Sequence, residues 1–380
     1  MHVGVNLIFL VPGETGGTET YARELVPELV AQRPDLELTF FVNRETGVAG
    51  QPWAELGRCV EVPVEARRRS QWVRGEQVLL PELVRRSSCD LLHSLANTAP
   101  LRGRFVRVTT IQDLLHRRRV RAHTPARAVF LRFLVPQVIR RSDRVLVPSY
   151  WTRAEVLALR ACDPARIDVV PHGAGRTPIP AASFEDVQRR YALDRRQTVL
   201  VVAPLRRHKQ VEVVVDAIAA IPAGRRPLAV LVGEAGGPDA ERLRAYARAT
   251  GVADDVRFAG SVGDAELEAL YATAACLVAP APYEGFGFPA AEAMARGLPV
   301  VYADGGSLPE VVADAGIRFE PGRAESLAPA VERILGDPAE RARLVAAGRG
   351  RAAELSWAAA ARATLRAYEA AVGSTATRAS

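Results

Sequence analysis

The residues best placed to do chemistry lie between Pro280 and Arg296. Two carboxylates, Glu284 and Glu292, are separated by seven residues, and the turn Gly285–Pro289 reads Gly-Phe-Gly-Phe-Pro. Because proline suits a first helical turn, we expect Glu284 in a loop after a strand and Glu292 about one turn into the following helix. Free amides at such a helix start bind phosphate oxygens or sugar hydroxyls. The alternative is structural: Glu292 supports the helix start and the glycines only turn the chain.

A second cluster of polar residues, Arg206, Arg207, His208 and Lys209, follows the apolar run 199–203. Lys209 is the only lysine among the 50 cationic Lys and Arg side chains of the chain. A compact ammonium group can neutralise a diphosphate where a doubly wound sheet presents its ligand. The alternative interpretation is a solvated basic loop.

A third feature joins the first apolar run to the first amphipathic segment. Gly16 and Gly17 let the backbone approach a ligand closely at a helix N-terminus. The segment contains no Gly-x-Gly-x-x-Gly, which disfavours a nicotinamide-dependent oxidoreductase. An ordinary turn explains the two glycines equally well.

These features depend on elements that alternate along nearly the whole chain. Expected strands are residues 3–9, 38–43, 91–94, 106–111, 145–148, 167–170, 199–203, 228–232, 256–259, 276–279, 300–302 and 317–319. Expected helices are residues 18–32, 77–86, 126–141, 152–159, 211–221, 240–250, 265–274, 288–296, 308–312, 326–335, a segment from 338, and 357–370. Such alternation predicts an α/β fold with parallel sheets covered by helices on both faces.

The breaker-rich segment 173–180 reads as a linker, so we expect two doubly wound, Rossmann-like domains facing across a cleft. The expected boundaries are residues 1–174, residues 175–355, and a C-terminal helix and tail, 356–380, that packs back on the first domain. Helix starts are expected from three caps: Thr152 with Glu155, Ser307 with Glu310, and Asp337 before Pro338 with Glu340.

Composition limits the classes of protein. The 380 residues are 48% apolar and 24% charged, which excludes a largely disordered chain. The net charge is +7, and residues 58–160 alone carry 21 arginines against eight acidic residues. A nucleic-acid-binding protein is disfavoured, because no recognised module is present and few aromatics lie among the arginines. The four scattered cysteines and the lack of a long apolar run predict a cytoplasmic protein.

The basic first half could still meet a membrane or an anionic acceptor. Arginine clusters at residues 67–69 and 117–119, with Arg121, would attract an anionic lipid or glycan. The segment 126–141 carries apolar residues at helical spacing, which would face either a membrane or the core: Val129, Phe130, Phe133, Leu134 and Val138. Peripheral contact with the inner face of the membrane is therefore an open alternative.

Taken together, these motifs resemble the family 4 retaining glycosyltransferases of GT-B fold (glycosyltransferase group 1, mannosyltransferase-like). The resemblance covers essentially the whole chain and is most specific in EGFGFPAAEAMARGLPVV, from Glu284. Further matching segments are GGTE from Gly16, VLVPSYWTRAEV from Val145, DPAR from Asp163 with the following VVPHGAG, and GGSLPEVV from Gly305.

The sequence departs from the family pattern at several positions. Gln112-Asp113 stands where many relatives have His-Asp, and His172 stands where the family usually has asparagine. Ala203-Pro204 replaces a pair that begins with glycine, and His208-Lys209-Gln210 replaces Arg-Lys-Asn. These changes concern donor identity and catalytic competence.

The resemblance implies transfer of a hexosyl group from a GDP- or UDP-sugar to a glycan, lipid or small-molecule acceptor, with retention and without a dedicated protein nucleophile. It implies catalytic roles for Glu284, Lys209 and position Gln112. Donor contacts would come from Gly16, Gly17, Arg206, His208, Lys209, Gly285, Phe286, Gly287, Phe288 and Glu292. Because no Asp-x-Asp is present, we expect no metal and no other cofactor. Alternatives are a relative that only binds sugar nucleotides and an epimerase of the same plan.

Overall fold

The structure is a computed structural model that describes residues 1–47, 51–118, 125–194, 196–234 and 236–379. Arg119 and Arg121 lie outside these ranges. The chain divides into two compact units. The first comprises Met1–Arg118, His123–Gly173 and Ser356–Ser380, and the second has Ala174–Leu355 as its body.

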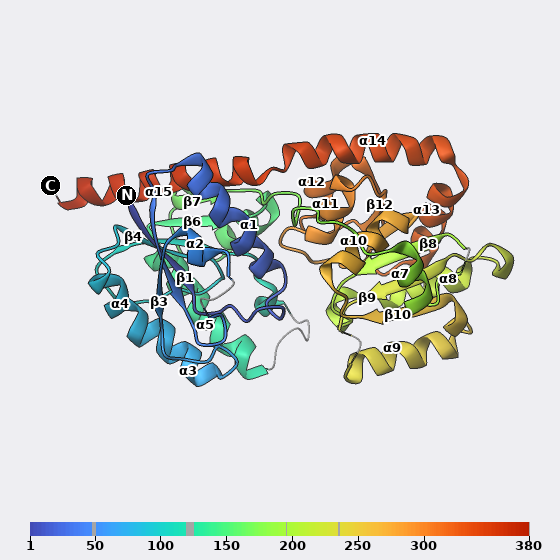
Figure 1. Cartoon of the computed structure of the whole chain (residues 1–380), viewed down its shortest axis with the longest axis horizontal. Helices are drawn as coiled ribbons and strands as arrows, with labels where there is room; N and C mark the ends of the chain where they lie inside the picture. Colours follow the sequence, from blue (N-terminus) through green and yellow to red (C-terminus); the bar gives the residue numbers. More distant parts are fainter. Residues whose placement is uncertain (48–50, 119–124, 195, 235, 380) are drawn as a thin grey trace. The chain divides into compact units, whose positions relative to one another are not determined.

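Unit 1 contains a seven-stranded parallel sheet in the order β3-β2-β1-β4-β5-β6-β7 (Figure 1). Its strands are β1 (His2–Leu7), β2 (Glu37–Val42), β3 (Arg58–Glu61), β4 (Leu91–Ser94), β5 (Val106–Thr110), β6 (Arg144–Val147) and β7 (Ile167–Val169). Its helices are α1 (Gly17–Gln32), α2 (Trp53–Leu56), α3 (Arg69–Arg74), α4 (Leu80–Arg86), α5 (Pro125–Arg141), α6 (Tyr150–Ala158) and α15 (Trp357–Ala379).

Unit 2 contains a six-stranded parallel sheet in the order β10-β9-β8-β11-β12-β13. Its strands are β8 (Thr198–Val202), β9 (Leu228–Val232), β10 (Val256–Gly260), β11 (Cys276–Ala279), β12 (Val300–Ala303) and β13 (Gly316–Phe319). Its helices are α7 (Phe184–Arg190), α8 (Glu212–Ala220), α9 (Pro238–Ala249), α10 (Asp264–Thr273), α11 (Phe288–Ala295), α12 (Leu308–Val312), α13 (Ala324–Gly336) and α14 (Pro338–Glu354).

The central strands of unit 2, β8, β9 and β11, are apolar apart from Thr198 because helices cover both faces of the sheet. In β8, Val199 and Val201 pack in a cluster with residues of α8 and α13, whereas Leu200, on the opposite face, packs with α10 and α11. This alternation follows from the two-residue repeat of a strand. The predicted α/β fold with two doubly wound units is confirmed.

The C-terminal helix α15 belongs to unit 1 and packs against α1, red beside blue in Figure 1. Arg33 forms an ion pair with Glu369 at 2.8 Å at the surface of this contact. Below the surface, the Tyr368 hydroxyl bonds to Nδ1 of the buried His93 at 2.7 Å. A polar bond inside the core thus fixes this helix to strand β4.

Two of the three predicted caps are wrong. Ser149, not Thr152, caps α6, and its side chain accepts from the Thr152 amide, while Glu155 bonds to Arg118. Ser307 precedes α12 but makes no capping hydrogen bond. Asp337 caps α14 as predicted, accepting from the amides of Ala339 and Glu340.

The apolar residues of α5 do not share one environment. Leu134 and Val138 are buried, whereas Val129 and Phe133 are 53% and 74% exposed. Phe130 is partly buried and lies edge-on to Trp72 at 6.5 Å between ring centroids. Of the five predicted residues, two are buried, Phe130 is partly buried, and two face solvent. None of the helices in the described ranges has the length and apolar character needed to cross a membrane.

Candidate functional site

The strand order of unit 2 reverses between β8 and β11, and the candidate site lies at this switch point. β9 and β10 continue to one side of β8, and β12 and β13 to the other side of β11. Loops that leave the carboxyl ends of such adjacent strands diverge and leave a crevice, where doubly wound proteins bind ligands. The loop after β8 carries Lys209, and the loop after β11 carries Glu284.

Lys209 and Glu284 meet at this crevice. The Lys209 Nζ donates to Glu284 Oε1 at 2.6 Å, and the two side chains are 15% and 23% exposed. A partly desolvated ion pair is stronger than a surface pair because water screens it less. An ammonium has three N–H donors, so two remain for a ligand after this bond. The sequence placed both residues at one edge of a sheet, and the structure joins them directly.

The loop that carries Glu284 is held by a second glycine turn. Gly306 has φ +62°, and a Cβ there would lie 2.7 Å from the Glu284 amide nitrogen. The Ser307 amide donates to the Glu284 carbonyl at 3.2 Å. Gly287, the residue before α11, has φ +97°, and its Cβ would lie 2.6 Å from Leu308 Cδ2. Only glycine fits these positions, so the two turns fix the carboxylate.

A narrow cavity lies beneath this loop. It is lined by Val202, Ala203, Ala279, Pro280, Ala281, Glu284, Gly287, Pro289, Ala290 and Leu308. These residues come from the ends of β8 and β11 and from the start of α11, where the first amides have no partner within the helix. The helix dipole adds positive potential there, which suits an anion.

The other residues of the basic cluster have separate environments. Arg206 is exposed and lies 3.9 Å from Glu234, in the loop after β9. Arg207 is exposed and lies 3.6 Å from Asp239 of α9. His208 is buried, with 8% of its surface exposed. Among the predicted donor contacts of this cluster, it therefore offers the smallest surface to a ligand.

Glu292 is the fifth residue of α11 and is already bonded within unit 2. Its Oε2 accepts from the Tyr271 hydroxyl at 2.8 Å, and its Oε1 accepts from both the amide and Nε of Arg176, at 3.2 and 3.3 Å. Gly175 has φ +82°, and a Cβ there would lie 1.9 Å from Glu292 Cγ. Burial, followed by the Glu292 charge, raises the pKa of Tyr271 well above its usual range.

The segment after Gly173 therefore runs directly over this carboxylate. The structural alternative was that Glu292 supports the start of its own helix. The geometry differs, because the carboxylate binds the linker and α10. Sequence reasoning missed Arg176 and Tyr271. Arg176 lies in the middle of the breaker-rich segment, and nothing in the neighbouring sequence marks it as a partner of a residue so far along the chain.

In unit 1, Gly16 has φ +62° and precedes the first turn of α1. A Cβ on Gly16 would meet no atom of the described chain within 4 Å, so the backbone is open on that side. The turn is closed by Glu19, which accepts from the Gly13 amide at 2.8 Å and pairs with Arg23. Gly16 and Gly17 belong to a different unit from Lys209 and Glu284.

Gln112 also lies in unit 1, after β5, and both ends of its side chain are bonded. Its Nε2 donates to the Leu95 carbonyl at 3.0 Å, and its Oε1 is 2.8 Å from Nε2 of His172. Burial lowers the pKa of His172 to about 3, so the imidazole is neutral. Its ring packs against Tyr21 and Trp357, at 4.4 and 5.9 Å between centroids. Two departures from the family pattern, at positions 112 and 172, thus contact each other.

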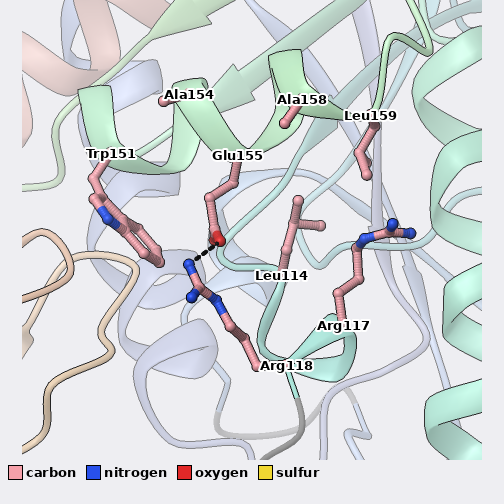
Figure 2. A pocket seen from close by; sticks show the side chains of 8 residues that line it. All are labelled: Leu114, Arg117, Arg118, Trp151, Ala154, Glu155, Ala158 and Leu159. Carbon is pink, nitrogen blue, oxygen red and sulfur yellow. Dashed lines mark hydrogen bonds and ion pairs between the residues drawn. The ribbon is translucent and has the colours of Figure 1, made fainter.

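An open pocket of about 440 Å³ lies between α6 and the 3₁₀ turn η2 (Leu115–Arg117) of unit 1 (Figure 2). It is lined by Leu114, Arg117, Arg118, Trp151, Ala154, Glu155, Ala158 and Leu159. No sequence pattern predicted this pocket, because its lining residues come from two separate segments. Within the described ranges, no group of three or more His, Cys, Asp or Glu side chains is placed to hold a metal ion.

Comparisons with known proteins agree with this architecture. The profile described as Glycosyltransferase Family 4 matches residues 15–174, and Glycosyl transferases group 1 matches residues 183–351. The O-antigen chain mannosyltransferase B of Escherichia coli is 29% identical over 267 residues, covering 69% of this chain and 70% of that protein. A D-inositol 3-phosphate glycosyltransferase of Frankia alni is 33% identical over 245 residues, and this chain spans only 60% of its length.

Solved structures share the fold over nearly the whole chain. Sucrose-phosphate synthase from Thermosynechococcus elongatus superposes with a TM-score of 0.76 at 22% identity, covering 97% of this chain and 98% of that one. WaaG, a glycosyltransferase of lipopolysaccharide biosynthesis, gives 0.74 at 18% identity, covering 96% and 99%. Anabaena Alr3699/HepE in complex with UDP-glucose gives 0.69 at 18% identity, covering 97% and 98%. The two matched profiles and this shared fold show that the chain belongs to the group 1, family 4 glycosyltransferases of GT-B fold.

Proposed function

We propose that this glycosyltransferase moves a hexosyl group from a nucleotide diphosphate sugar to a glycan, lipid or small-molecule acceptor, with retention of configuration and without a metal ion. The observation that carries the proposal is the Lys209–Glu284 ion pair at the switch point of unit 2. A UDP-sugar or a GDP-sugar is the expected donor. UDP and UDP-glucose occur in the HepE complexes, and a mannosyltransferase is among the sequence relatives.

In this proposal the two spare N–H groups of Lys209 bind the diphosphate and stabilise the charge that gathers on it as the glycosidic bond breaks. Arg206, whose carbonyl accepts from the Lys209 amide at 2.9 Å, supplies a second cation in this proposal, and the amides of Gly285–Phe288 complete the anion site. The second Glu284 oxygen orients the sugar, and its charge stabilises positive character at the anomeric carbon. Fixed charges in a crevice act without reorganisation, which is the main source of such catalysis.

Glu292 is proposed to bind the ribose hydroxyls of the donor. One of its oxygens already accepts twice from Arg176, so the ribose competes with that guanidinium. Gly16 and Gly17 remain proposed donor contacts, and Gln112 a proposed catalytic position. The His172–Gln112 bond supports this role only by holding the amide in one orientation.

The proposal is tested by incubating the protein with UDP-, GDP-, dTDP- and ADP-sugars and following release of the nucleotide and the sugar anomer by NMR. Release of the α-anomer from an α-linked donor, unchanged by EDTA, is expected. Turnover that EDTA abolishes and magnesium restores would refute metal independence, and inversion would refute retention. Donor binding without turnover would favour the non-catalytic alternative, and formation of an epimeric sugar nucleotide would favour the epimerase.

We also propose that unit 1 contacts anionic membrane, in keeping with a protein at the inner membrane face. Exposed Phe133 and Val129 supply the apolar contact, and the exposed Arg132 beside them supplies charge. Co-sedimentation with phosphatidylglycerol vesicles at low salt is expected to pull down the protein, and Phe133→Ser to weaken this. Absence of binding at low salt would leave only the soluble acceptors.

A further inference from the structure

The pocket beside α6 has the chemistry of a binding site. Figure 2 shows Trp151 and Glu155 projecting from α6 toward Arg118, with Arg117 and Leu114 on the neighbouring segment. A volume of about 440 Å³ is within the range of small-molecule pockets and fits a single sugar or polyol.

Among the described residues that line this pocket, cations outnumber acids. Glu155 accepts from Arg118 at 2.8 Å, and these side chains are 17% and 50% exposed. Arg117 is exposed and makes no ion pair or side-chain hydrogen bond with another residue in the described part of the chain. Two guanidinium groups against one carboxylate give the lining a positive charge. A guanidinium donates two parallel hydrogen bonds to a phosphate or a carboxylate, and two guanidinium groups in one pocket together suit the double negative charge of a phosphate monoester.

The remaining surface of the pocket is aromatic and apolar. The Arg118 guanidinium carbon lies 5.6 Å from the Trp151 ring centroid, which fixes both groups by a cation–π contact. Leu114 and Leu159 supply apolar contacts on the other side. An indole face beside an apolar wall packs against the carbon face of a sugar or cyclic polyol. The lining therefore combines a flat apolar support with a phosphate-binding group.

The place of the pocket in unit 1 relates it to the proposed reaction. The turn η2 follows β5 and α6 follows β6, so both segments leave the carboxyl edge of the sheet. Gln112 leaves the same edge, two residues before Leu114. Ligands of doubly wound units bind at this edge.

We infer that this pocket binds the acceptor of the transfer reaction, and that the acceptor is a phosphate monoester of a sugar or polyol, held at its phosphate by Arg117 and Arg118. This inference rests on the proposed glycosyltransferase function and adds the chemical class of its acceptor. The phosphate could belong to a free metabolite or to a lipid headgroup, and both share the recognition chemistry described here.

The test is isothermal titration with D-glucose 6-phosphate and D-myo-inositol 1-phosphate, their unphosphorylated parents, and vesicles containing phosphatidylinositol 4-phosphate. At least one phosphorylated probe is expected to bind where its parent does not. A free monoester that binds alone identifies a metabolite, and vesicles that bind alone identify a lipid headgroup. Arg117→Ala is expected to weaken binding roughly 10- to 100-fold, the value of losing a charge-assisted hydrogen bond.

Arg104→Ala is the matched control, because Arg104 is an exposed arginine of unit 1 outside the pocket. It removes the same charge and is expected to leave probe affinity unchanged. Equal loss in both variants would mean that only net charge matters and would overturn the inference, as would failure of every phosphorylated probe to bind. Titration with UDP-glucose and GDP-mannose separates the two proposals. If a sugar nucleotide binds and no phosphorylated probe does, the inference about the pocket is overturned and the proposed function stands. If a phosphorylated probe binds, loses its binding in Arg117→Ala, and no sugar nucleotide binds, the proposed function alone is overturned.

Discussion

Replacing Lys209 by methionine removes the ammonium but keeps most of the side chain's length and packing. At 2.6 Å and an effective dielectric constant of about 20, its attraction to Glu284 is about 6 kcal/mol, most of it offset by lost hydration. The partial exposure of both groups limits the loss of folding stability to about 1–2 kcal/mol. The loss of transition-state stabilisation is larger, about 3–4 kcal/mol, or 10²–10³ in kcat.

Steady-state turnover of the best donor and urea unfolding are measured on Lys209→Met, Glu284→Gln and the double variant. The double variant is expected to lose less than the product of the single losses, because each removal also strands the partner of the same ion pair. Arg207→Met is the control: it lies on the same 3₁₀ turn but is exposed and pairs with Asp239. Near-normal kcat in Lys209→Met, or an equal loss in Arg207→Met, would refute the reasoning.

Three further predictions concern the surroundings of the site. Arg176→Ala removes the guanidinium bond to Glu292 Oε1 but keeps the bond from the backbone amide. It is expected to lower the donor KM roughly 3- to 10-fold, the value of one hydrogen bond, and a raised KM would contradict competition with the ribose. Gln112→His combined with His172→Asn places an imidazole at position 112 and an amide at position 172. This double variant is expected to retain more activity than either single variant, and single losses of activity that multiply in the double variant would contradict this. From pH 6.5 to 4.5, the free energy of unfolding measured with urea is expected to fall by about 1.4 kcal/mol per pH unit. A free energy of unfolding that does not change with pH would contradict the pKa shifts of three buried groups in unit 1.

The sign of that pH slope follows from three buried groups of unit 1. Burial lowers the pKa of His93 and of His172 to about 3, so below pH 6.5 the unfolded chain takes up two protons that the folded chain does not. Burial raises the pKa of Glu76 to about 7, so between pH 4.5 and 7 the folded chain holds one proton more. The difference is one proton, and Glu76→Gln, which removes the opposing group, is expected to double the slope to about 2.8 kcal/mol per pH unit.

Sequence patterns predicted the strands and helices that are determined by the residues within them. The inner strands of unit 2, β8, β9, β11 and β12, are apolar apart from Thr198 and almost wholly buried, and all six strands were expected near their observed places. Strand β3 was missed because Arg58–Glu61 is a partly exposed edge strand with charged ends, where no continuous apolar run is needed. The short helices α2 and α3 were missed for a related reason, since four and six residues are too few to show a period.

The candidate site was likewise predicted in part: some of its contacts follow from the sequence and others do not. Lys209 and Glu284 could be brought together from sequence, because the ends of neighbouring parallel strands share one edge of the sheet. The bonding of Glu292 could not, because Arg176 lies 116 residues away and reaches it through a segment without secondary structure. The contact of Gln112 with His172 likewise depends on how two loops approach across 60 residues, which no local period records.

The central claim is that the crevice of Lys209 and Glu284 holds the donor diphosphate. Its most direct test is thermal unfolding of the wild type, Lys209→Met and Arg207→Met with a panel of UDP-, GDP-, dTDP- and ADP-sugars, since a ligand that binds the folded state raises the melting temperature. We predict that at least one sugar nucleotide stabilises the wild type and Arg207→Met, and that Lys209→Met loses most of this shift. Stabilisation of all three proteins to the same extent, or of none by any nucleotide sugar, would contradict the account.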